Sequence, residues 1–167
     1  MARIKKRQKF FVIAHNMRSL YNVGSIFRTA DSFNVSKIYL TGYTGTPGNE
    51  LHRLRMQKSA LGAETWVPWE HCKSPSRLIK KLKSEGVKIV ALENKVPAGA
   101  GVSRPQSITK FKPKFPLALV LGEEVRGVSK AILKLCDSAV EIPMFGKKES
   151  LNVSVAFGIA AYVLRIK

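Results

Sequence analysis

The sequence predicts one α/β domain over residues 1–167, with a mostly parallel β-sheet and helices on both of its faces. Short apolar runs alternate with segments of helical periodicity along the chain, which is the pattern of repeated βα units. Two of the runs, Val87–Leu92 and Leu117–Leu121, are apolar over nearly their whole length, as expected of strands covered on both faces. A chain of 167 residues is long enough for one domain with a proper core.

The N-terminal half is expected to hold three helices between four strands. Apolar residues recur at helical spacing along one face of the first helix, and a glycine follows each of the other two as a stop signal. Asn16–Ser19 is expected to be a turn, and the glycine-rich stretch 42–48 a loop. In chain order, the elements are strand Phe10–His15, helix Leu20–Phe33, strand Lys37–Thr41, helix Leu51–Leu61, strand Thr65–Pro68, helix Ser74–Glu85 and strand Val87–Leu92.

The C-terminal half begins with a long surface crossover between Lys95 and Pro116, which is rich in prolines and basic residues. The last helix is apolar nearly all round, whereas an outer helix of a three-layer domain normally keeps a polar face toward water. We therefore expect this helix to lie in a homodimer interface. The elements after the crossover are strand Leu117–Leu121, helix Ser129–Cys136, strand Ala139–Met144 and helix Val153–Ile166.

The charge of the chain indicates a polyanionic partner. Its 29 lysines and arginines against 11 aspartates and glutamates give a net charge of +18, for which nucleic acid is the natural partner. An anionic membrane surface is the alternative, but no segment reaches the ~18 apolar residues of a spanning helix. Residues 1–9 form a basic arm, and the apolar run behind it is too short for a signal peptide. We therefore expect no membrane association and a cytoplasmic location.

Neither a metal nor a disulfide framework is indicated. Cys72 and Cys136 lie far apart without a C-x-x-C motif, and the three histidines are scattered. No G-x-G-x-x-G motif follows the first strand, so a nucleotide site of the open Rossmann type is not supported.

Three segments combine polar residues with glycines at the ends of predicted elements. Residues 16–31 read N-M-R-S-L-Y-N-V-G-S-I-F-R-T-A-D. Residues 117–128 end a buried strand in G-E-E-V-R-G, which puts carboxylates at the sheet edge where α/β proteins bind ligands. Residues 139–156 join a strand to the last helix through G-K-K-E-S-L-N, where backbone N–H groups can bind a polar ligand. The simpler alternative makes Asn22, Ser150 or Asn152 a helix cap and Arg28 a solvated charge.

Together, these segments resemble the SpoU/TrmH branch of the SPOUT superfamily, the RNA 2′-O-ribose methyltransferases. The first family motif, N-x-R-x-x-x-N-x-G-x-x-x-R-x-A, is matched at 16–30, and the second, a strand followed by G-x-E-x-x-G, at 117–127. The third, I-P-M-x-G-x-x-x-S-L-N-V-S-x-A, is matched at 142–156. Three motifs in order make the resemblance specific, and it extends from about Phe10 to the end. The chain departs from the family at Glu123, where many members carry a small polar residue.

The resemblance implies a deep C-terminal trefoil knot, in which the last strand, loop and helix pass through a loop of the chain. It also implies a homodimer, in agreement with the apolar last helix. The implied cofactor is S-adenosylmethionine, held mainly by loop backbone. Carried onto this chain, the cofactor contacts fall at Leu92, Gly122, Ile142, Met144, Ser150 and Leu151.

The resemblance assigns catalysis to Arg28. A free arginine is always charged and is a poor base, so we hypothesise that it lowers the pKa of the ribose 2′-hydroxyl, directly or through the neighbouring phosphate. Four further residues are expected to orient Arg28, the ribose and the loops, namely Asn22, Glu124, Ser150 and Asn152. RNA is expected to contact basic residues that could otherwise be merely solvated, namely Arg18, Arg3, Lys5, Lys6 and Arg7.

The expected function is transfer of a methyl group from S-adenosylmethionine to a ribose 2′-hydroxyl of tRNA or rRNA. We favour tRNA slightly, because the chain is minimal. Without the extra N-terminal RNA-binding domain of some relatives, RNA recognition is expected to fall to the core and its basic edges. One alternative is a non-catalytic RNA-binding or ribosome-assembly protein that keeps the fold. Another is a base methyltransferase of a sister SPOUT family, although those lack the Asn…Arg first motif. The RNA, the nucleotide, and whether Arg28 acts in its own or a partner's active site stay open.

Overall fold

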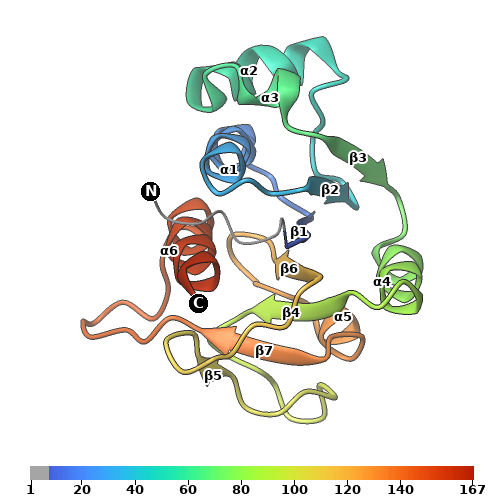
Figure 1. The fold of residues 1–167 in the computed structure, drawn as a ribbon. Coiled ribbons are helices and arrows are strands. Elements are labelled where there is room, and N and C mark those ends of the chain that lie inside the picture. Colours follow the sequence, from blue (N-terminus) through green and yellow to red (C-terminus); the bar gives the residue numbers. More distant parts are fainter. Residues whose placement is uncertain (1–7) are drawn as a thin grey trace, which may run out of the picture.

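The computed structural model describes residues 8–167 and shows an α/β domain built on one seven-stranded sheet. The strands are all parallel and follow the order β3-β2-β1-β6-β4-β7-β5 (Figure 1). This confirms the predicted fold class. The strands are β1 Phe10–His15, β2 Lys37–Thr41, β3 Trp69–Cys72, β4 Lys88–Leu92, β5 Gln106–Ser107, β6 Leu117–Leu121 and β7 Ser138–Glu141.

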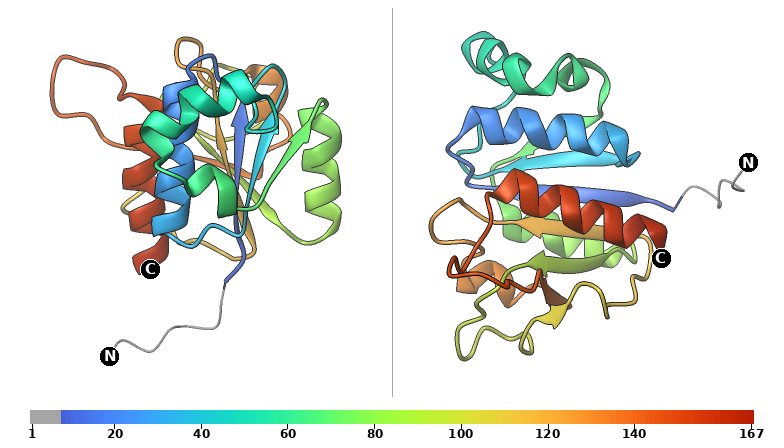
Figure 2. Two further views of the ribbon diagram at one scale, coloured as in Figure 1. Left: turned by 90° about the horizontal axis from the view of Figure 1, so that it is seen from above. Right: turned by 90° about the vertical axis from the view of Figure 1, so that its left-hand side faces the viewer.

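Helices cover both faces of this sheet, as Figure 2 shows. One face packs against α1 and α6, and the other against α4 and α5. The α2 and α3 helices pack on the outer side of α1, beyond the sheet edge formed by β3. The helices are α1 Leu20–Ser32, α2 Glu50–Ala60, α3 Ala63–Trp66, α4 Pro75–Ser84, α5 Lys130–Leu133 and α6 Val153–Ile166.

The central strands divide their side chains between two cores, because successive residues of a strand point to opposite faces. In β6, Leu117, Leu119 and Leu121 pack in the core that contains α1 and α6. Ala118 and Val120 pack in the core that contains α4 and α5. All five side chains are buried, which explains why this run is apolar throughout instead of alternating.

The expected strand Thr65–Pro68 is wrong. Ala63–Trp66 forms the helical turn α3, and the strand begins only at Trp69. Pro68 ends the turn, because the residue before a proline is disfavoured in the helical conformation and Val67 is extended. The true strand lies at the sheet edge and is only partly covered, so it lacks the apolar pattern from which strands are predicted.

Other boundaries are shorter than expected. The predicted last strand stops at Glu141, since Pro143 has no N–H for the sheet ladder. The helix expected over Ser129–Cys136 is limited to Lys130–Leu133. The crossover contains a strand that was not predicted, β5, whose two residues pair with β7 and are too few to form a pattern. Predicted strands β1, β2 and β6 and helix α6 have the bounds expected from the sequence.

The α6 helix buries one side and exposes an apolar stripe on the other. Four of its side chains are fully covered against the sheet and α1. The stripe, consisting of Val155, Ile159, Tyr162 and Ile166, is exposed in the single chain, and its spacing keeps the four side chains on one face. Within residues 8–167, no helix is both long and apolar enough to cross a lipid bilayer.

Candidate active site

A cavity opens at the carboxyl edge of the sheet, where the segments that follow β4, β6 and β7 meet. Its volume is about 280 Å³, near the lower end of the range for small-molecule sites. The location follows a general rule, since open parallel sheets bind ligands outside the carboxyl ends of their strands. All six residues expected to contact a cofactor line this cavity, namely Leu92, Gly122, Ile142, Met144, Ser150 and Leu151.

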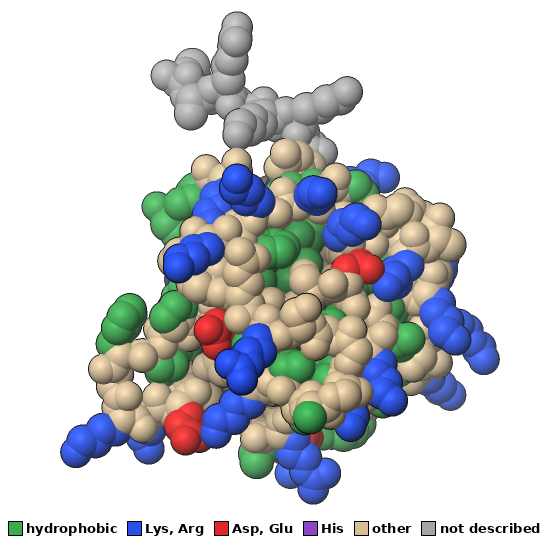
Figure 3. All heavy atoms as spheres, turned by 90° about the horizontal axis from the view of Figure 1, so that it is seen from below, with side chains coloured by type: hydrophobic (Ala, Val, Ile, Leu, Met, Phe, Trp, Pro, Cys, Tyr) green, Lys and Arg blue, Asp and Glu red, His purple; other side chains and the backbone are tan. Residues whose placement is uncertain are grey.

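The cavity is acidic although the chain is strongly basic. Figure 3 shows lysines and arginines spread over one face of the molecule, with few acidic side chains among them. The cavity lining instead holds four glutamates against one lysine and one arginine. The remaining wall is largely apolar, so the cavity suits a cationic ligand with an apolar part better than a polyphosphate. The charged lining residues are Glu93, Glu123, Glu124, Glu149, Lys95 and Arg126.

The loop after β6 is closed tightly on itself. A Cβ at Gly122 would stand 2.1 Å from the carbonyl carbon of Gly127, so only glycine fits at this position. Gly127 has a φ of +67° and donates its N–H to the Glu123 carbonyl at 3.0 Å. This closure directs the two glutamates that follow Gly122 toward the mouth of the cavity.

Glu93 is a cavity residue that the sequence analysis missed. It follows β4, and its carboxylate accepts hydrogen bonds from the N–H groups of Val128 at 2.8 Å and Lys95 at 3.1 Å. It therefore ties the segments after β4 and β6 together. The signal that could have found it is a carboxylate directly after a buried strand, at the same sheet edge as Gly122.

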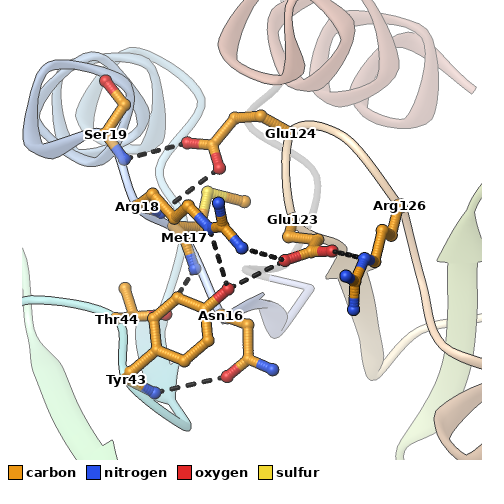
Figure 4. A network of polar contacts seen from close by, with 9 residues as sticks. All are labelled: Asn16, Met17, Arg18, Ser19, Tyr43, Thr44, Glu123, Glu124 and Arg126. Atoms are coloured by element: carbon orange, nitrogen blue, oxygen red, sulfur yellow. Dashed lines mark hydrogen bonds and ion pairs between the residues drawn. The ribbon is translucent and has the colours of Figure 1, made fainter.

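A carboxylate joins the loop after β6 to the start of α1. The Glu124 side chain accepts hydrogen bonds from the N–H groups of Arg18 at 3.2 Å and Ser19 at 3.0 Å (Figure 4). It also accepts one from the side-chain amide of Asn22 at 3.1 Å. Burial raises the pKa of Glu124, but these hydrogen bonds outweigh it, and the net pKa lies below the ordinary 4.5. The carboxylate is therefore ionised at neutral pH.

The same network continues to the start of α6. The Asn22 side-chain oxygen accepts a hydrogen bond from the Asn152 amide at 3.1 Å. The Asn152 side-chain oxygen in turn accepts from the N–H groups of Ser154 at 2.9 Å and Val155 at 3.4 Å, and so caps α6. Asn152 thus caps α6 and is also joined to Asn22 of α1. Three predicted site residues that are distant in sequence form one hydrogen-bonded chain, and Ser150 lines the cavity beside them.

Arg28 lies apart from this network. It is exposed on α1, and among residues 8–167 its side chain takes part in no hydrogen bond or ion pair of the single chain. Arg18, expected to bind RNA, is also exposed, and its guanidinium contacts Tyr43 and Glu123 at the cavity mouth. The other predicted RNA contacts, Arg3, Lys5, Lys6 and Arg7, lie outside the described residues.

The polar groups of the described residues form no candidate metal centre. Within residues 8–167, no three His, Cys, Asp or Glu side chains come together in a group that could hold a metal ion.

Comparisons with known sequences identify the family to which the chain belongs. The family model described as the SpoU rRNA methylase family matches residues 9–162. The tRNA (guanosine(18)-2′-O)-methyltransferase of Aquifex aeolicus is 32% identical over 160 residues, which cover 95% of this chain and 70% of that protein. The 23S rRNA (guanosine(2553)-2′-O)-methyltransferase RlmP of Bacillus subtilis is 34% identical over 146 residues, covering 86% and 53%. This chain therefore spans only half to about two thirds of the length of such relatives.

Solved structures agree with the sequence relatives. The TrmH/SpoU tRNA modifying enzyme of A. aeolicus superposes with a TM-score of 0.81 at 28% identity, covering 97% of this chain and 76% of that one. An AdoMet-bound rRNA methyltransferase from Sinorhizobium meliloti superposes with a TM-score of 0.80 at 25% identity, covering 95% and 56%. With its fold, its three motifs and its cavity in agreement, this chain belongs to the SpoU rRNA methylase family.

Proposed function

We propose that the chain is an S-adenosylmethionine-dependent methyltransferase that modifies a ribose 2′-hydroxyl of tRNA or rRNA. The observation that carries the proposal is the acidic cavity at the carboxyl edge of the sheet, bordered by the Glu124–Asn22–Asn152 network. Relatives named as 2′-O-methyltransferases of tRNA and of 23S rRNA support the reaction. They leave the choice between the two RNA classes open, so the proposal covers both.

The cavity fits the proposed cofactor in charge and polarity. Leu92, Ile142 and Met144 offer an apolar wall for an adenine ring, and the glutamates of the lining offset the charge of a sulfonium. When bound, the cofactor supplies an electrophilic methyl group, and the protein supplies position and electrostatics. The loop carrying Ser150 and Leu151 adds backbone groups at the same cavity.

The protein must then align the ribose and make its 2′-oxygen nucleophilic. Asn22 and Asn152 fix the start of α6 beside the cavity through their mutual hydrogen bond, and Ser150 adds a hydroxyl at the same edge. Arg28 has the role of stabilising negative charge on the 2′-oxygen, which lowers the pKa of that hydroxyl. As an always-charged side chain it acts through its charge and its N–H donors, not by accepting the proton.

A second copy of the chain explains why Arg28 lies apart from the network. Its neighbour Thr29 faces Gly158 of α6, with 4.0 Å from the Thr29 methyl group to a Cβ placed at Gly158. Arg28, the residue before Thr29, is exposed, and so are Val155, Ile159 and Tyr162 of α6. A homodimer formed through this stripe would cover it and bring Arg28 to the partner's cavity. Ile159→Glu is then expected to give monomers in sedimentation experiments, and an unchanged dimer would contradict this interface.

We also propose the trefoil knot of the family for the C-terminal segment. Contacts between the segments after β4 and β7 support it. The Asn94 amide donates to the Glu149 carbonyl at 3.0 Å, and Lys95 forms an ion pair with the Glu149 carboxylate. The knotted segment would thus form one wall of the cavity before entering α6.

The reaction is tested with labelled S-adenosylmethionine and separate pools of tRNA and rRNA. Wild-type protein is expected to label one pool. Arg28→Ala should reduce the rate about 100-fold or more, because it removes the charge that stabilises the developing oxyanion, and should leave cofactor binding by calorimetry unchanged. Arg55→Ala on α2 removes an equal charge from another exposed position and serves as the control.

Three results would decide against the assignments. Full activity in Arg28→Ala would contradict the role of Arg28 while preserving the reaction. Label on a base would favour a base methyltransferase. Absence of both transfer and cofactor binding would favour a non-catalytic RNA-binding protein.

A further inference from the structure

At the mouth of the cavity lies a cluster of side chains that are joined to one another by polar contacts. It consists of Tyr43, Arg18, Glu123 and Arg126, which come from the segment after β2, the turn after β1 and the loop after β6 (Figure 4). Glu123 and Arg126 line the cavity, so the cluster forms part of its mouth.

The aromatic ring of Tyr43 is exposed but held in place. Its hydroxyl donates a hydrogen bond to the Glu123 carboxylate at 2.8 Å, and its backbone N–H donates to the side-chain oxygen of Asn16 at 3.3 Å. Its exposed fraction is nevertheless 53%. An exposed tyrosine normally loses side-chain freedom when it binds a ligand, and one that is already fixed loses less. Tyr43 is therefore a preorganised flat apolar surface at the mouth of the cavity.

Glu123 is the centre of the cluster. Its side chain is only 12% exposed, and it faces both arginines as well as Tyr43. The distances are 3.9 Å to the Arg18 guanidinium and 3.5 Å to that of Arg126. Both carboxylate oxygens are thus engaged within the protein, so Glu123 is a support for its neighbours and not itself a ligand group.

The two arginines keep donors for a further anion. Their side chains are 66% and 83% exposed, and each guanidinium has five N–H groups, of which the cluster uses only some. The hydrogen bond with Tyr43, together with the charges of Glu123 and Glu124, raises the pKa of Arg18. Arginines that are fixed by a carboxylate and remain exposed are suited to bind phosphate.

We propose that Tyr43 is a stacking platform for the base of the nucleotide that is methylated, with Arg18 and Arg126 binding its flanking phosphates and Glu123 positioning all three. The proposal rests on the proposed function, because it assumes that RNA enters this cavity. An aromatic platform beside fixed arginines is the arrangement by which proteins hold single-stranded nucleotides. Stacking is tolerant of base identity, so the platform would orient the ribose toward the cavity without choosing the nucleotide.

The platform is tested by binding, which does not depend on methyl transfer. Fluorescein-labelled ten-residue oligoadenylate is titrated with the full chain and followed by anisotropy. Tyr43→Ala is expected to weaken binding about tenfold through the loss of one stacked base. Tyr43→Phe and Tyr43→Trp keep a ring and are expected to stay within about twofold of wild type. An oligonucleotide of the same length that lacks bases should bind wild type and Tyr43→Ala equally.

The two roles of the cluster are separated by the same titrations. If Tyr43 only supported Glu123, Tyr43→Phe, which cannot donate to that carboxylate, would be as weak as Tyr43→Ala, and the proposal would be overturned. Equal binding by Tyr43→Ala and wild type would overturn it as well. Arg18→Gln and Arg126→Gln should each make binding less dependent on salt. The slope of the logarithm of the binding constant against the logarithm of the salt concentration should fall by about the amount expected for one phosphate contact. If binding follows this pattern but no RNA is methylated, Tyr43 stands as a stacking surface for RNA, while its link to a methylated nucleotide fails together with the proposed function.

Discussion

The two ends of α6 are held by different means. Its first turn is partly buried and is fixed by neutral amide hydrogen bonds, from Asn152 to Asn22 and from the helix N–H groups to Asn152. Its last turn is fixed by two cations. Arg165 donates hydrogen bonds to the backbone carbonyl groups of Phe33, Gln8 and Asn34. Lys167 donates to those of Ile108, Thr109 and Phe111.

The C-terminal end also contacts aromatic rings. The Arg165 guanidinium lies 5.1 Å from the ring centre of Phe10 and 5.6 Å from that of Phe115, which are cation–π distances. Burial lowers the pKa of Arg165 below its usual range. The N-terminal end borders the cavity instead, with Val153 and Ala156 in the lining. We infer from this difference that the C-terminal end of α6 stabilises the helix, so that the N-terminal end can present polar groups to a ligand.

The largest expected effect on stability is at Arg165. Arg165→Met should lower the free energy of unfolding by about 3 kcal/mol, because three carbonyl groups lose a charged donor and two aromatic contacts are lost. The measurement is urea unfolding followed by circular dichroism. Arg165→Lys keeps the charge but not the planar guanidinium group, so its free energy of unfolding should lie between those of wild type and Arg165→Met. A loss below about 1 kcal/mol in Arg165→Met would show that this end does not carry the stability of the helix.

A smaller and different effect is expected at the other end. Asn152→Ser can still cap α6 but cannot donate an amide hydrogen to Asn22, so stability should change by less than about 1 kcal/mol. Methyl transfer should nevertheless fall about tenfold or more, since the start of α6 is no longer tied to the α1 side of the site. The comparison of unfolding and transfer rates in one preparation checks this. Equal losses of stability in Asn152→Ser and Arg165→Met would remove the distinction between the two ends.

The smallest effect concerns pH and Glu124. Its folded-state pKa is lowered by the hydrogen bonds of the network, so its contribution to stability is fully present above the ordinary pKa of an unfolded glutamate. It is lost as the pH falls through the lower folded pKa. Wild type should therefore be more stable than Glu124→Gln at pH 7, and the gap should close as the solution is acidified. If the difference in stability between wild type and Glu124→Gln widened on acidification, burial and not hydrogen bonding would determine the direction of the pKa shift of Glu124.

The sequence predicts the fold most reliably where a strand or helix is apolar in its own right. The bounds of β6 and α6 were predicted because each is a dense apolar run between polar turns. By contrast, β3 and β5 are short and half exposed, and only pairing with a neighbouring strand makes them strands. Strand propensity and hydrophobic periodicity are properties of one segment, so they do not predict pairing between segments.

The site was predictable through its motifs and not through periodicity. Five of the six predicted cofactor contacts lie in the motifs, and these five line one cavity together with the sixth, Leu92, whereas Glu93 and Tyr43 lie outside the motifs and were missed. Both follow buried strands at the carboxyl edge, which is the signal that could have found them. The separation of Arg28 from the network could not be foreseen, because a motif gives the residues and not the direction in which a helical side chain points.

One measurement tests the proposed reaction most directly. RNA labelled by the wild-type protein from S-adenosylmethionine is hydrolysed completely with alkali, and the products are separated by size. A methyl group on the ribose 2′-oxygen blocks cleavage of the next phosphodiester bond, so the label is predicted to appear in alkali-resistant dinucleotides from tRNA or rRNA. Label recovered in mononucleotides would place the methyl group on a base and would contradict the proposed chemistry of the cavity.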